Sequence, residues 1–354
     1  MNLAFMQAQK NLGNTKQNPS VGCVIVKKNN VISAGSTSIY GRPHAEFNAI
    51  KHSKYNIKNS QLYSTLEPCS HHGKTPPCVN LIVKNRIKKV FFSIKDPDPR
   101  SYNQSKKILQ KNKITTNCKI LNLKGNLFYV SYIRCRKQSL PFVTAKIAVS
   151  KDLFTNNKKN KWITNQYSRG RVHLMRSCHD CIITSSNTII KDNPRLNCRI
   201  DGLKNRSPSI IILDKKLETP INSKIIKNSK PYNTIIFFYN KNKKKIEYLK
   251  KLKIKLIEMP LSNKGNFDLE KVLLQIKLLG YSRIFLESGI SLIGNFLKGA
   301  LINNLYIFKS SRKLGKNGSK SMKSYMNLIN KNKKNQEKVN LFGDKLLKYR
   351  FNNV

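Results

Sequence analysis

The spacing of apolar residues predicts that strands and helices alternate through the first 150 residues. Short β-branched runs predict strands, and apolar residues three and four positions apart predict helices. Two of the runs flank Asn29-Asn30 and therefore predict a hairpin. The predicted strands are Val21–Val26, Val31–Ala34, Gln61–Leu66, Lys89–Ile94 and Cys118–Asn122, and the predicted helices are Leu3–Leu12, Pro43–His52, Pro77–Asn85 and Ser101–Lys111. Such alternation is typical of a layered α/β domain.

A second series of apolar runs begins near Pro141 and predicts a second α/β domain with a sheet of its own. Its strands are predicted at Phe142–Val149, Cys181–Ser185, Ser209–Leu213, Asn233–Tyr239, Lys253–Glu258, Arg283–Glu287 and Leu301–Phe308, and its helices at Gln166–Ser177, Asp268–Leu279 and Ser291–Lys298. Residues Val339–Phe351 could add late antiparallel strands. The polar stretch Tyr132–Leu140 is interpreted as the linker, which divides the chain into domains of residues 1–138 and 139–354.

The sequence shows neither of two common targeting features. No stretch approaches the roughly 18 uninterrupted apolar residues that cross a bilayer, and residues 1–10 lack the basic and apolar regions of a secretory signal. We therefore expect a cytoplasmic protein that contacts no membrane. The eight cysteines are then expected to be reduced, some of them as metal ligands.

The charge of the chain is strongly unbalanced. The chain has 68 Lys and Arg residues and 17 Asp and Glu residues, and its formal net charge is +51. Such a charge attracts polyanions without specificity. The lysines are, however, spread among asparagine and isoleucine, in runs such as Asn156–Lys161, as AT-rich codons favour. We interpret the charge as compositional drift, keep a selected basic surface as the alternative, and predict no specific nucleic-acid partner.

A histidine and two cysteines form the clearest candidate for chemistry. His44, Cys69 and Cys78 supply one imidazole and two thiolates, a ligand set that leaves zinc an open fourth position. Water bound at such a position loses a proton near neutral pH. Glu46 follows His44 by two residues and could carry that proton to a ring nitrogen and then to the leaving amine. The alternative is a zinc ion that only staples a loop.

The motif matches the signature of zinc-dependent base deaminases in part. That signature reads H-x-E followed by P-C-x-x-C, with the glutamate not bound to zinc. His44-Ala45-Glu46 and Pro68-Cys69 fit it, but the second cysteine lies nine positions after the first. The intervening segment contains His71 and His72, which we expect to contact the substrate or the metal ligands, or else to be exposed.

The long cysteine spacing is itself informative. The segment Leu66–Cys78, with the sequence LEPCSHHGKTPPC, resembles the deaminase domain of the bifunctional riboflavin-biosynthesis deaminase/reductase family, as do Asn18–Val26 and Gly41–Glu46. The resemblance implies a cytidine-deaminase-like three-layer domain with one zinc ion per chain. It also implies hydrolytic deamination of a diaminopyrimidinone that carries a ribosylamino 5′-phosphate. Asn18 is a plausible contact to the pyrimidine ring, because an amide both donates and accepts hydrogen bonds.

The second half carries weaker signals of its own. Arg283–Glu287, Ser288-Gly289 and the apolar run that follows predict a strand, a glycine turn and a helix, whose N-terminus offers free N–H groups to a phosphate. No G-x-G-x-x-G fingerprint is present, so a nicotinamide site would be of another kind. The C-x-x-C run Cys178–Cys181 is interpreted as packing rather than as a redox or zinc site.

The resemblance continues through this half. Ala145–Ser150, Thr188–Leu196 and Leu286–Gly289 are similar to the reductase domain of the same family, which implies a dihydrofolate-reductase-like α/β fold, NADPH as cofactor, reduction of the ribosyl group to ribityl, and a homo-oligomer. The matching motifs imply that NADPH is bound by Ala148, Trp162, Thr188, Asp192, Gly289, Ile290, Ser291, Leu292, Ile293, Gly294 and Asn295. They imply that the substrate is bound by Asn160, Arg176, Leu196, Arg199 and Glu287.

Three departures from the family pattern affect the second domain. Leu153 stands where a glycine is usual, Asn160-Lys161 replaces a serine and a glutamine, and Asn303-Asn304 replaces an acidic pair. They leave a deaminase with an inactive reductase as one alternative. The others are a base deaminase acting on tRNA or DNA, which leaves the second domain unexplained, and a non-catalytic basic protein with a structural zinc.

Overall fold

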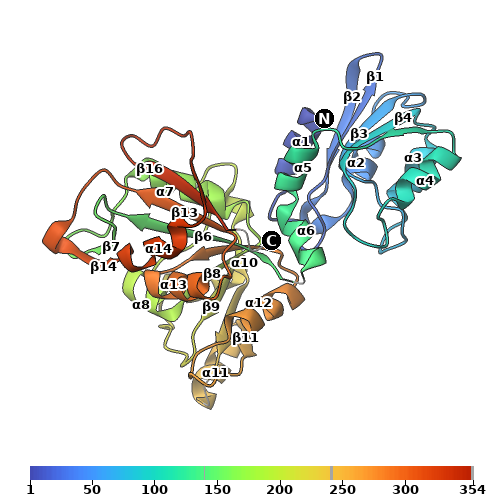
Figure 1. Ribbon diagram of the computed structural model, residues 1–354. Helices are drawn as coiled ribbons and strands as arrows, with labels where there is room; N and C mark the ends of the chain where they lie inside the picture. The colour runs from blue at the N-terminus through green and yellow to red at the C-terminus, as the bar shows by residue number, and fades with distance from the viewer. Residues whose placement is uncertain (139, 240–241, 352–354) are drawn as a thin grey trace. The chain divides into compact units, whose positions relative to one another are not determined.

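The computed structural model describes residues 1–138, 140–239 and 242–351 and divides the chain into two units, Met1–Ser139 and Leu140–Val354 (Figure 1). Each unit has its own sheet and its own apolar core. Of the described helices the longest, α7, has 11 residues, and none is long and apolar enough to cross a membrane.

Unit 1 is a five-stranded sheet, in the order β2-β1-β3-β4-β5, between two layers of helices (Figure 1). Its strands are β1 (Gly22–Lys27), β2 (Asn30–Ser36), β3 (Gln61–Leu66), β4 (Lys89–Ile94) and β5 (Thr115–Asn117). Its helices are α1 (Asn2–Gln9), α2 (Ala45–Lys51), α3 (Cys78–Lys84), α4 (Gln104–Lys111), α5 (Asn122–Phe128) and α6 (Val130–Lys137). The predicted hairpin is confirmed, since β1 and β2 pair antiparallel.

Two glycines let helices approach the two faces of this sheet. A Cβ atom on Gly22 would lie 1.9 Å from the backbone oxygen of Ala4 in α1, and one on Gly35 would lie 2.4 Å from the backbone nitrogen of Ala49 in α2. Any side chain would therefore push α1 or α2 away from the sheet. The close approach of α2 matters for function, because α2 carries His44 and Glu46 at its start.

The structure corrects three predictions in unit 1. The helix predicted from Pro43 begins at Ala45, because His44 is extended, with φ −72° and ψ 161°. The strand predicted at Cys118–Asn122 lies earlier, as β5. The proposed linker is helical through Lys137 as α6, with residue 139 outside the described ranges.

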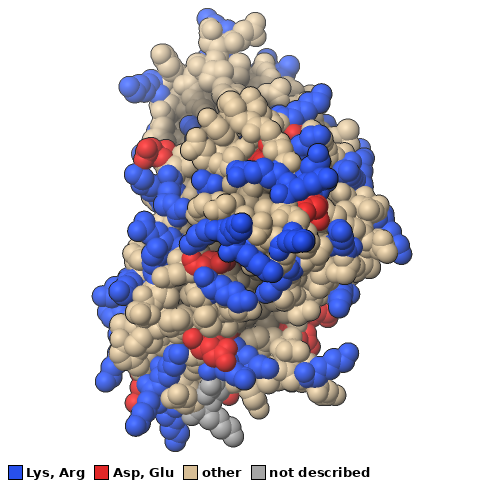
Figure 2. All heavy atoms as spheres, turned by 90° about the vertical axis from the view of Figure 1, so that its left-hand side faces the viewer, with Lys and Arg blue, Asp and Glu red and all other residues tan. Residues whose placement is uncertain are grey.

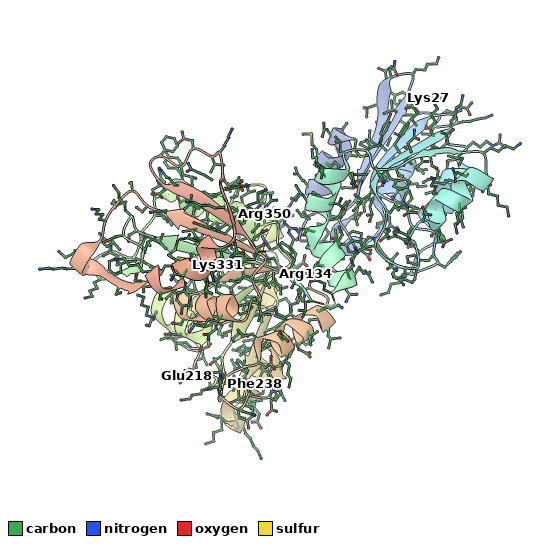
Figure 3. The ribbon with its side chains drawn as sticks, viewed as in Figure 1. Lys27, Arg134, Glu218, Phe238, Lys331 and Arg350 are labelled. Carbon is green, nitrogen blue, oxygen red and sulfur yellow. The ribbon has the colours of Figure 1, made fainter. Side chains whose placement is uncertain are left out.

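Helix α6 is helical because one of its faces is buried in unit 1. The Tyr132 side chain is buried and its hydroxyl donates a hydrogen bond to Asp96 Oδ1 over 3.0 Å. Arg134, labelled in Figure 3, is also buried. A stretch that looks polar in sequence is thus held to the unit 1 core by Tyr132 and Ile133.

Unit 2 is a nine-stranded sheet in the order β11-β10-β9-β8-β12-β6-β13-β16-β15, accompanied by a two-stranded ribbon, β14-β7. The strands are β6 (Phe142–Val149), β7 (Phe154–Asn157), β8 (Cys181–Ser185), β9 (Ser209–Leu213), β10 (Thr234–Phe238), β11 (Lys255–Glu258), β12 (Arg283–Glu287), β13 (Asn304–Lys309), β14 (Gly318–Ser321), β15 (Lys333–Gln336) and β16 (Lys345–Arg350). The seven strands from β11 to β13 run parallel. Strand β16 pairs antiparallel with β13, and β15 pairs antiparallel with β16, so β15 again runs in the direction of the seven.

Helices cover both faces of this sheet, which explains why its parallel strands are apolar on both sides. Residues of α12 and α13 join one core cluster, and residues of α7, α8, α9 and α11 join the other. The helices are α7 (Gln166–Arg176), α8 (Ser186–Asp192), α9 (Lys224–Lys227), α10 (Ser229–Tyr232), α11 (Lys243–Lys251), α12 (Leu269–Leu278), α13 (Ile290–Lys298) and α14 (Met326–Asn330). Phe238, the last residue of β10, is buried within this arrangement (Figure 3).

One buried histidine makes the stability of unit 2 depend on pH. The Nδ1 atom of His179 lies 2.6 Å from the backbone oxygen of Met175, and the ring packs 4.9 Å from that of Phe285. Burial, with a contribution from Arg283, lowers the pKa of His179 to about 3. Its ordinary value is about 6.5. The neutral ring therefore contributes stability that is complete above pH 6.5 and is lost as the pH falls from 6.5 toward 3.

We expect His179 to weaken the folded unit 2 by about 1.4 kcal/mol for each pH unit below 6.5. His179→Phe removes the proton that the unfolded chain gains, so its free energy of unfolding should fall less between pH 7 and pH 5. Urea titrations followed by the fluorescence of Trp162, the single tryptophan, measure the difference in unit 2. Equal pH slopes in the two proteins would contradict this assignment.

Candidate functional site

The candidate metal ligands converge at one end of the unit 1 sheet. His44 caps the N-terminus of α2, Cys69 follows β3, and Cys78 is the first residue of α3. His44 Nδ1 lies 3.5 Å from Cys69 Sγ and 3.4 Å from Cys78 Sγ, and all three donor atoms lie within 4.8 Å of one another. One nitrogen and two sulfurs at this spacing fit a tetrahedral zinc ion with its fourth position left for water.

The N-terminal ends of helices α2 and α3, which lie at the site, favour thiolate ligands. The backbone N–H of Cys78 donates a hydrogen bond to Cys69 Sγ over 3.3 Å. The contact between the two thiols lowers the pKa of Cys69 and raises the pKa of Cys78, so that they hold one proton between them. A divalent cation replaces such a proton readily, because it stabilises both thiolates.

Glu46 lies beside the ligand cluster without belonging to it. Its side chain is buried, and Oε1 accepts a hydrogen bond of 3.1 Å from Ser64 Oγ in β3. Burial raises the pKa of Glu46, and the Cys69 thiolate raises it further, whereas His44 lowers it. The carboxyl group is thus held in place at the edge of the cluster, where it can exchange a proton with a nearby water.

A cavity of about 340 Å³ opens onto these residues. His44, Glu46 and Cys69 line one part of it. The other lining residues of the cavity are Asn18, Pro19, Val21, Thr37, Arg42, Leu66, Glu67, His71, Gly73, Lys74, Asp96, Asp98, Arg100, Tyr132 and Arg136. The volume suits a ligand of metabolite size. Its lining includes four Lys and Arg side chains and four Asp and Glu side chains.

Several predicted contacts lie at this cavity. Asn18 lines it and donates a hydrogen bond of 2.8 Å from Nδ2 to the backbone oxygen of Gly41. His71 also lines it, and its Nδ1 lies 2.8 Å from Ser101 Oγ. His72 is not among the lining residues. Asn18 and His71 are therefore placed to meet a ligand.

The acidic residues of the cavity differ in their charge. Arg100 forms a bidentate ion pair with Asp98, and Arg136 lies 3.4 Å from the same carboxylate. The hydrogen bond from Arg100 is the largest of the effects that lower the pKa of Asp98 to about 2. Burial instead raises the pKa of Asp96 to about 6. Asp98 is thus a permanent anion between two arginines, and Asp96 holds its proton more readily.

In unit 2 the predicted substrate residues Arg176 and Glu287 form a buried ion pair. The Arg176 guanidinium donates two hydrogen bonds, of 2.8 and 2.9 Å, to the two carboxylate oxygens of Glu287. Lys146 Nζ lies 3.6 Å from the same carboxylate. Burial by itself raises the pKa of Glu287, but Arg176 and Lys146 together lower it to about 2.

Sequence reasoning missed two residues of this site. Lys146 lies within the apolar strand β6, where the alternation of apolar and polar residues predicts that a lysine faces solvent. Its ammonium group instead contacts Glu287. His173 accepts at Nδ1 a 3.3 Å hydrogen bond from the backbone of Arg199, and burial is the largest of the effects that lower its pKa to about 4. The (i, i+3) spacing of His173 and Arg176 on one helix was the available signal.

The remaining predicted substrate residues differ in how close they lie to this ion pair. Arg199 reaches the site through Asn197, whose backbone oxygen accepts a 2.9 Å bond from Arg176 and whose side chain accepts one from Arg199. Leu196 is buried with φ +52°. Asn160 lies on an exposed loop.

The predicted cofactor residues meet at the start of α13. The hydroxyl groups of Ser185, Thr188 and Ser288 lie 2.9 to 3.1 Å from one another, and the backbone N–H of Gly289 donates to Thr188 Oγ1 over 3.3 Å. Gly289 caps α13, whose first residues are Ile290, Ser291, Leu292, Ile293, Gly294 and Asn295. Free N–H groups and hydroxyls in this arrangement suit a phosphate.

Three other cofactor candidates lie on separate segments. Ala148 is half-buried in β6, and Asp192 ends α8 in an exposed position. Trp162 is 55% exposed, and the Arg169 guanidinium stacks 4.7 Å from its ring centroid. An exposed indole with a cation on one face can accept a flat ring on the other.

The departures from the family pattern have local consequences. Leu153 has φ +71°, a left-handed backbone conformation in which glycine is favoured. Asn303 is buried, and its Oδ1 accepts a 2.8 Å hydrogen bond from the backbone N–H of Val143. Asn303 therefore has a structural role at the end of the sheet.

Comparisons with known proteins match both units. Residues 141–346 match the family model described as the RibD C-terminal domain, and residues 1–94 match the cytidine and deoxycytidylate deaminase zinc-binding region. The riboflavin biosynthesis protein RibD of Actinobacillus pleuropneumoniae is 32% identical over 89% of this chain and 84% of its own length. That of Aquifex aeolicus is 32% identical over 89% of this chain and 87% of its own.

Solved structures agree over the whole length. The RibD structure from Acinetobacter baumannii has a TM-score of 0.83 and 25% identity, and covers 99% of this chain and 97% of that one. A diaminohydroxyphosphoribosylaminopyrimidine deaminase/5-amino-6-(5-phosphoribosylamino)uracil reductase from Thermotoga maritima has a TM-score of 0.84 and 27% identity, with the same coverage.

Proposed function

The chain belongs to the RibD family of bifunctional riboflavin-biosynthesis enzymes, and from that premise we propose which of its residues carry each reaction. The family, the α/β class of both domains and the two activities predicted from the motifs are confirmed. The protein deaminates 2,5-diamino-6-(ribosylamino)pyrimidinone 5′-phosphate and then, with NADPH, reduces the ribosyl group to ribityl. We assign the first reaction to residues 1–138 and the second to residues 139–354.

The deaminase assignment rests on the cluster of His44, Cys69 and Cys78 and on the cavity that His44, Cys69 and Glu46 line. When bound there, zinc supplies a water of lowered pKa. Glu46 takes a proton from water and gives it to the ring nitrogen, and then takes the second proton from the added hydroxyl group and gives it to the departing amine. The water oxygen stays on the ring as a carbonyl, and the amino group leaves as ammonia. Ser64 keeps the Glu46 carboxyl group oriented during the exchange.

The basic rim of the cavity fits the phosphate of the substrate. Arg42, Lys74, Arg100 and Arg136 all line the cavity, and Asp98 pairs with Arg100 and Arg136, so Arg42 and Lys74 are the cations best placed to meet the phosphate. Charge-assisted hydrogen bonds from such groups hold a phosphate more firmly than neutral donors do. Asn18 and His71 remain to meet the pyrimidine ring.

The reductase assignment rests on the buried cluster of Lys146, Arg176 and Glu287 beside the hydroxyls and N–H groups at the start of α13. NADPH supplies the hydride. The cofactor residues are those named above, from Ala148 and Trp162 to the first turns of α13. Arg176, Arg199, Glu287, Leu196 and Asn160 bind the ribosyl phosphate, and Lys146 and Glu287 orient its reacting carbon.

Cys78→Ser is expected to lower the zinc content from one ion per chain to well below one, because a serine hydroxyl is a poor zinc ligand. Metal analysis of purified protein measures the change, and ammonia release should fall with the zinc. Cys118→Ser is the matched control, since Cys118 is a half-buried thiol outside the cluster. Full zinc content in Cys78→Ser would remove Cys78 from the ligand set.

One assay separates this function from its alternatives. Purified protein is given the diaminopyrimidine phosphate with and without NADPH, and ammonia and NADPH oxidation are followed together. Ammonia release without NADPH oxidation would leave a deaminase with an inactive reductase. We also propose, from the family, that the enzyme acts in the cytoplasm and that it forms a homo-oligomer. Light scattering on the purified protein tests the oligomeric state.

A further inference from the structure

The loop at residues 340–344 is attached to the start of helix α7. It lies directly before β16, and α7 and β16 lie side by side in Figure 1. Asp344 is buried, and its Oδ2 atom accepts hydrogen bonds from the backbone N–H of Asn165 over 2.9 Å and from Ser168 Oγ over 2.7 Å. The Asn165 side chain donates in return to two backbone oxygens of the loop, over 2.6 and 3.1 Å. Two segments 179 positions apart in the chain are thus joined by four hydrogen bonds.

Aromatic and apolar contacts hold the same loop against α7. The rings of Phe342 and Tyr167 stack with centroids 4.0 Å apart and an interplanar angle of 25°. Leu341 is buried in the same apolar cluster as Val172 of α7. The backbone turns sharply after it, since φ is +49° at Phe342 and +95° at Gly343. The first turn of α7 is therefore fixed by a carboxylate, an aromatic stack and a buried leucine.

That first turn carries Arg169, whose guanidinium stacks 4.7 Å from the centroid of the Trp162 ring. Arg169 Nη1 also donates a 2.8 Å hydrogen bond to the backbone oxygen of Thr164, and its backbone N–H donates to that of Asn165 over 3.3 Å. Lysine and arginine side chains are frequent on the face shown in Figure 2, so an arginine at the surface is not distinctive by itself. Arg169 differs because both its backbone and its guanidinium are held in place.

The orientation of the Trp162 indole depends on this contact. The side chain is 55% exposed, so few other groups restrict its rotamer. The guanidinium of Arg169 is attracted to one face of the ring and covers it. Lys161 lies farther from the centroid, at 5.6 Å, and is exposed, so its flexible side chain can move aside. A flat ring can then stack on the indole face opposite Arg169.

We propose that Asp344 and Arg169 are positioning residues of the reductase, which hold Trp162 in the orientation that stacks on a flat ring of NADPH. This inference rests on the proposed function, since it takes Trp162 as a cofactor residue. Asp344 fixes the first turn of α7, that turn fixes Arg169, and Arg169 fixes the indole. The two residues act on cofactor binding and not on hydride transfer, because an indole that is already oriented loses less side-chain freedom when the cofactor binds.

The first test compares Arg169→Met with Arg169→Lys in the full-length protein. Methionine keeps an unbranched stem without a charge, whereas lysine keeps a cation that can lie over the indole. Arg169→Met should raise the Kd and the KM for NADPH about fivefold and leave kcat unchanged, and Arg169→Lys should recover most of the affinity. Trp162 is the only tryptophan, so energy transfer from it to the reduced nicotinamide measures the Kd directly.

The second test removes the anion from the start of α7. Asp344→Asn should raise the Kd for NADPH about threefold, again with an unchanged kcat, which also shows that the variant folds. Asp268→Asn is the matched control, because Asp268 accepts two backbone N–H groups at the N-terminus of α12 in the same unit. Before NADPH is added, acrylamide should quench Trp162 more strongly in Asp344→Asn and Arg169→Met than in the wild type or the control, since the covered face of the indole becomes accessible.

The outcomes separate this inference from the function on which it rests. Equal affinity for NADPH in the wild type and Arg169→Met, or equal losses in Arg169→Met and Arg169→Lys, overturns the positioning role and leaves the reductase assignment standing. The same holds for Asp344 if Asp344→Asn behaves as the control does. NADPH binding that leaves the fluorescence of Trp162 unchanged overturns its cofactor role, and this inference with it. A wild type that binds no NADPH contradicts the proposed function itself.

Discussion

Glu46→Gln is expected to lower the rate of ammonia release by about 10²–10⁴-fold, because glutamine cannot accept a proton from water or pass it to the pyrimidine ring. The zinc content should stay at one ion per chain, since Glu46 lies beside the ligand cluster and is not a member of it. Glutamine is nearly the same size as glutamate and can keep the hydrogen bond from Ser64. The loss should therefore lie in the chemistry and not in the fold.

The second activity of the same molecule provides the control for this variant. NADPH oxidation, measured with the deaminated intermediate supplied from outside, should equal that of the wild type in Glu46→Gln. Metal analysis and ammonia release on the same preparation complete the set. Ammonia release at the wild-type rate from a zinc-loaded Glu46→Gln protein would show that another group carries the proton.

The strands of the two sheets are the part of the fold that sequence predicts best. Gln61–Leu66 and Lys89–Ile94 in unit 1, and Phe142–Val149 and Arg283–Glu287 in unit 2, coincide with β3, β4, β6 and β12. Each is a short apolar run bounded by polar or turn-forming residues, and burial on both faces demands such a run. The pattern is strong because the physical requirement is strict.

Short polar elements cannot be predicted from apolar runs. The ribbon of β7 and β14 has the sequences FTNN and GSKS, which carry no apolar alternation, and its pairing depends on contacts between distant segments. Sequence also misplaced the start of α2, because a proline before an apolar helix predicts the first helical position. Here Pro43 is followed by an extended His44, and the helix starts after both.

The two sites differ in how far sequence defines them. The motif that contains His44, Glu46, Cys69 and Cys78 predicts a metal site, and the fold brings the donor atoms of His44, Cys69 and Cys78 together. The reductase cluster is less visible, because Lys146, Arg176 and Glu287 are single polar residues on three unlinked elements. Only the parallel pairing of β6 with β12, which sets Lys146 opposite Glu287, makes them neighbours.

The buried carboxylate of that cluster carries the second large effect. Glu287→Gln is expected to lower kcat/KM for NADPH oxidation by about 10²-fold or more, because it leaves Arg176 and Lys146 as buried cations without their anion. Arg176 and Lys146 then lose the anion that holds them, and a shift of about 1 Å in groups that position a substrate can cost about 10²-fold in rate. Ammonia release should not change, since Glu46 and the zinc ligands are untouched.

Two comparisons test whether the loss of NADPH oxidation arises from the cluster of Lys146, Arg176 and Glu287. Glu258→Gln, which removes an exposed carboxylate from β11, should leave NADPH oxidation unchanged. Arg176→Met combined with Glu287→Met should cost less than the sum of the two single substitutions, because each one alone leaves a buried partner uncompensated. Additive losses, or full NADPH oxidation in Glu287→Gln, would mean that the carboxylate only fills space at the end of β12, and the assignment of this cluster to the ribosyl phosphate would then fail.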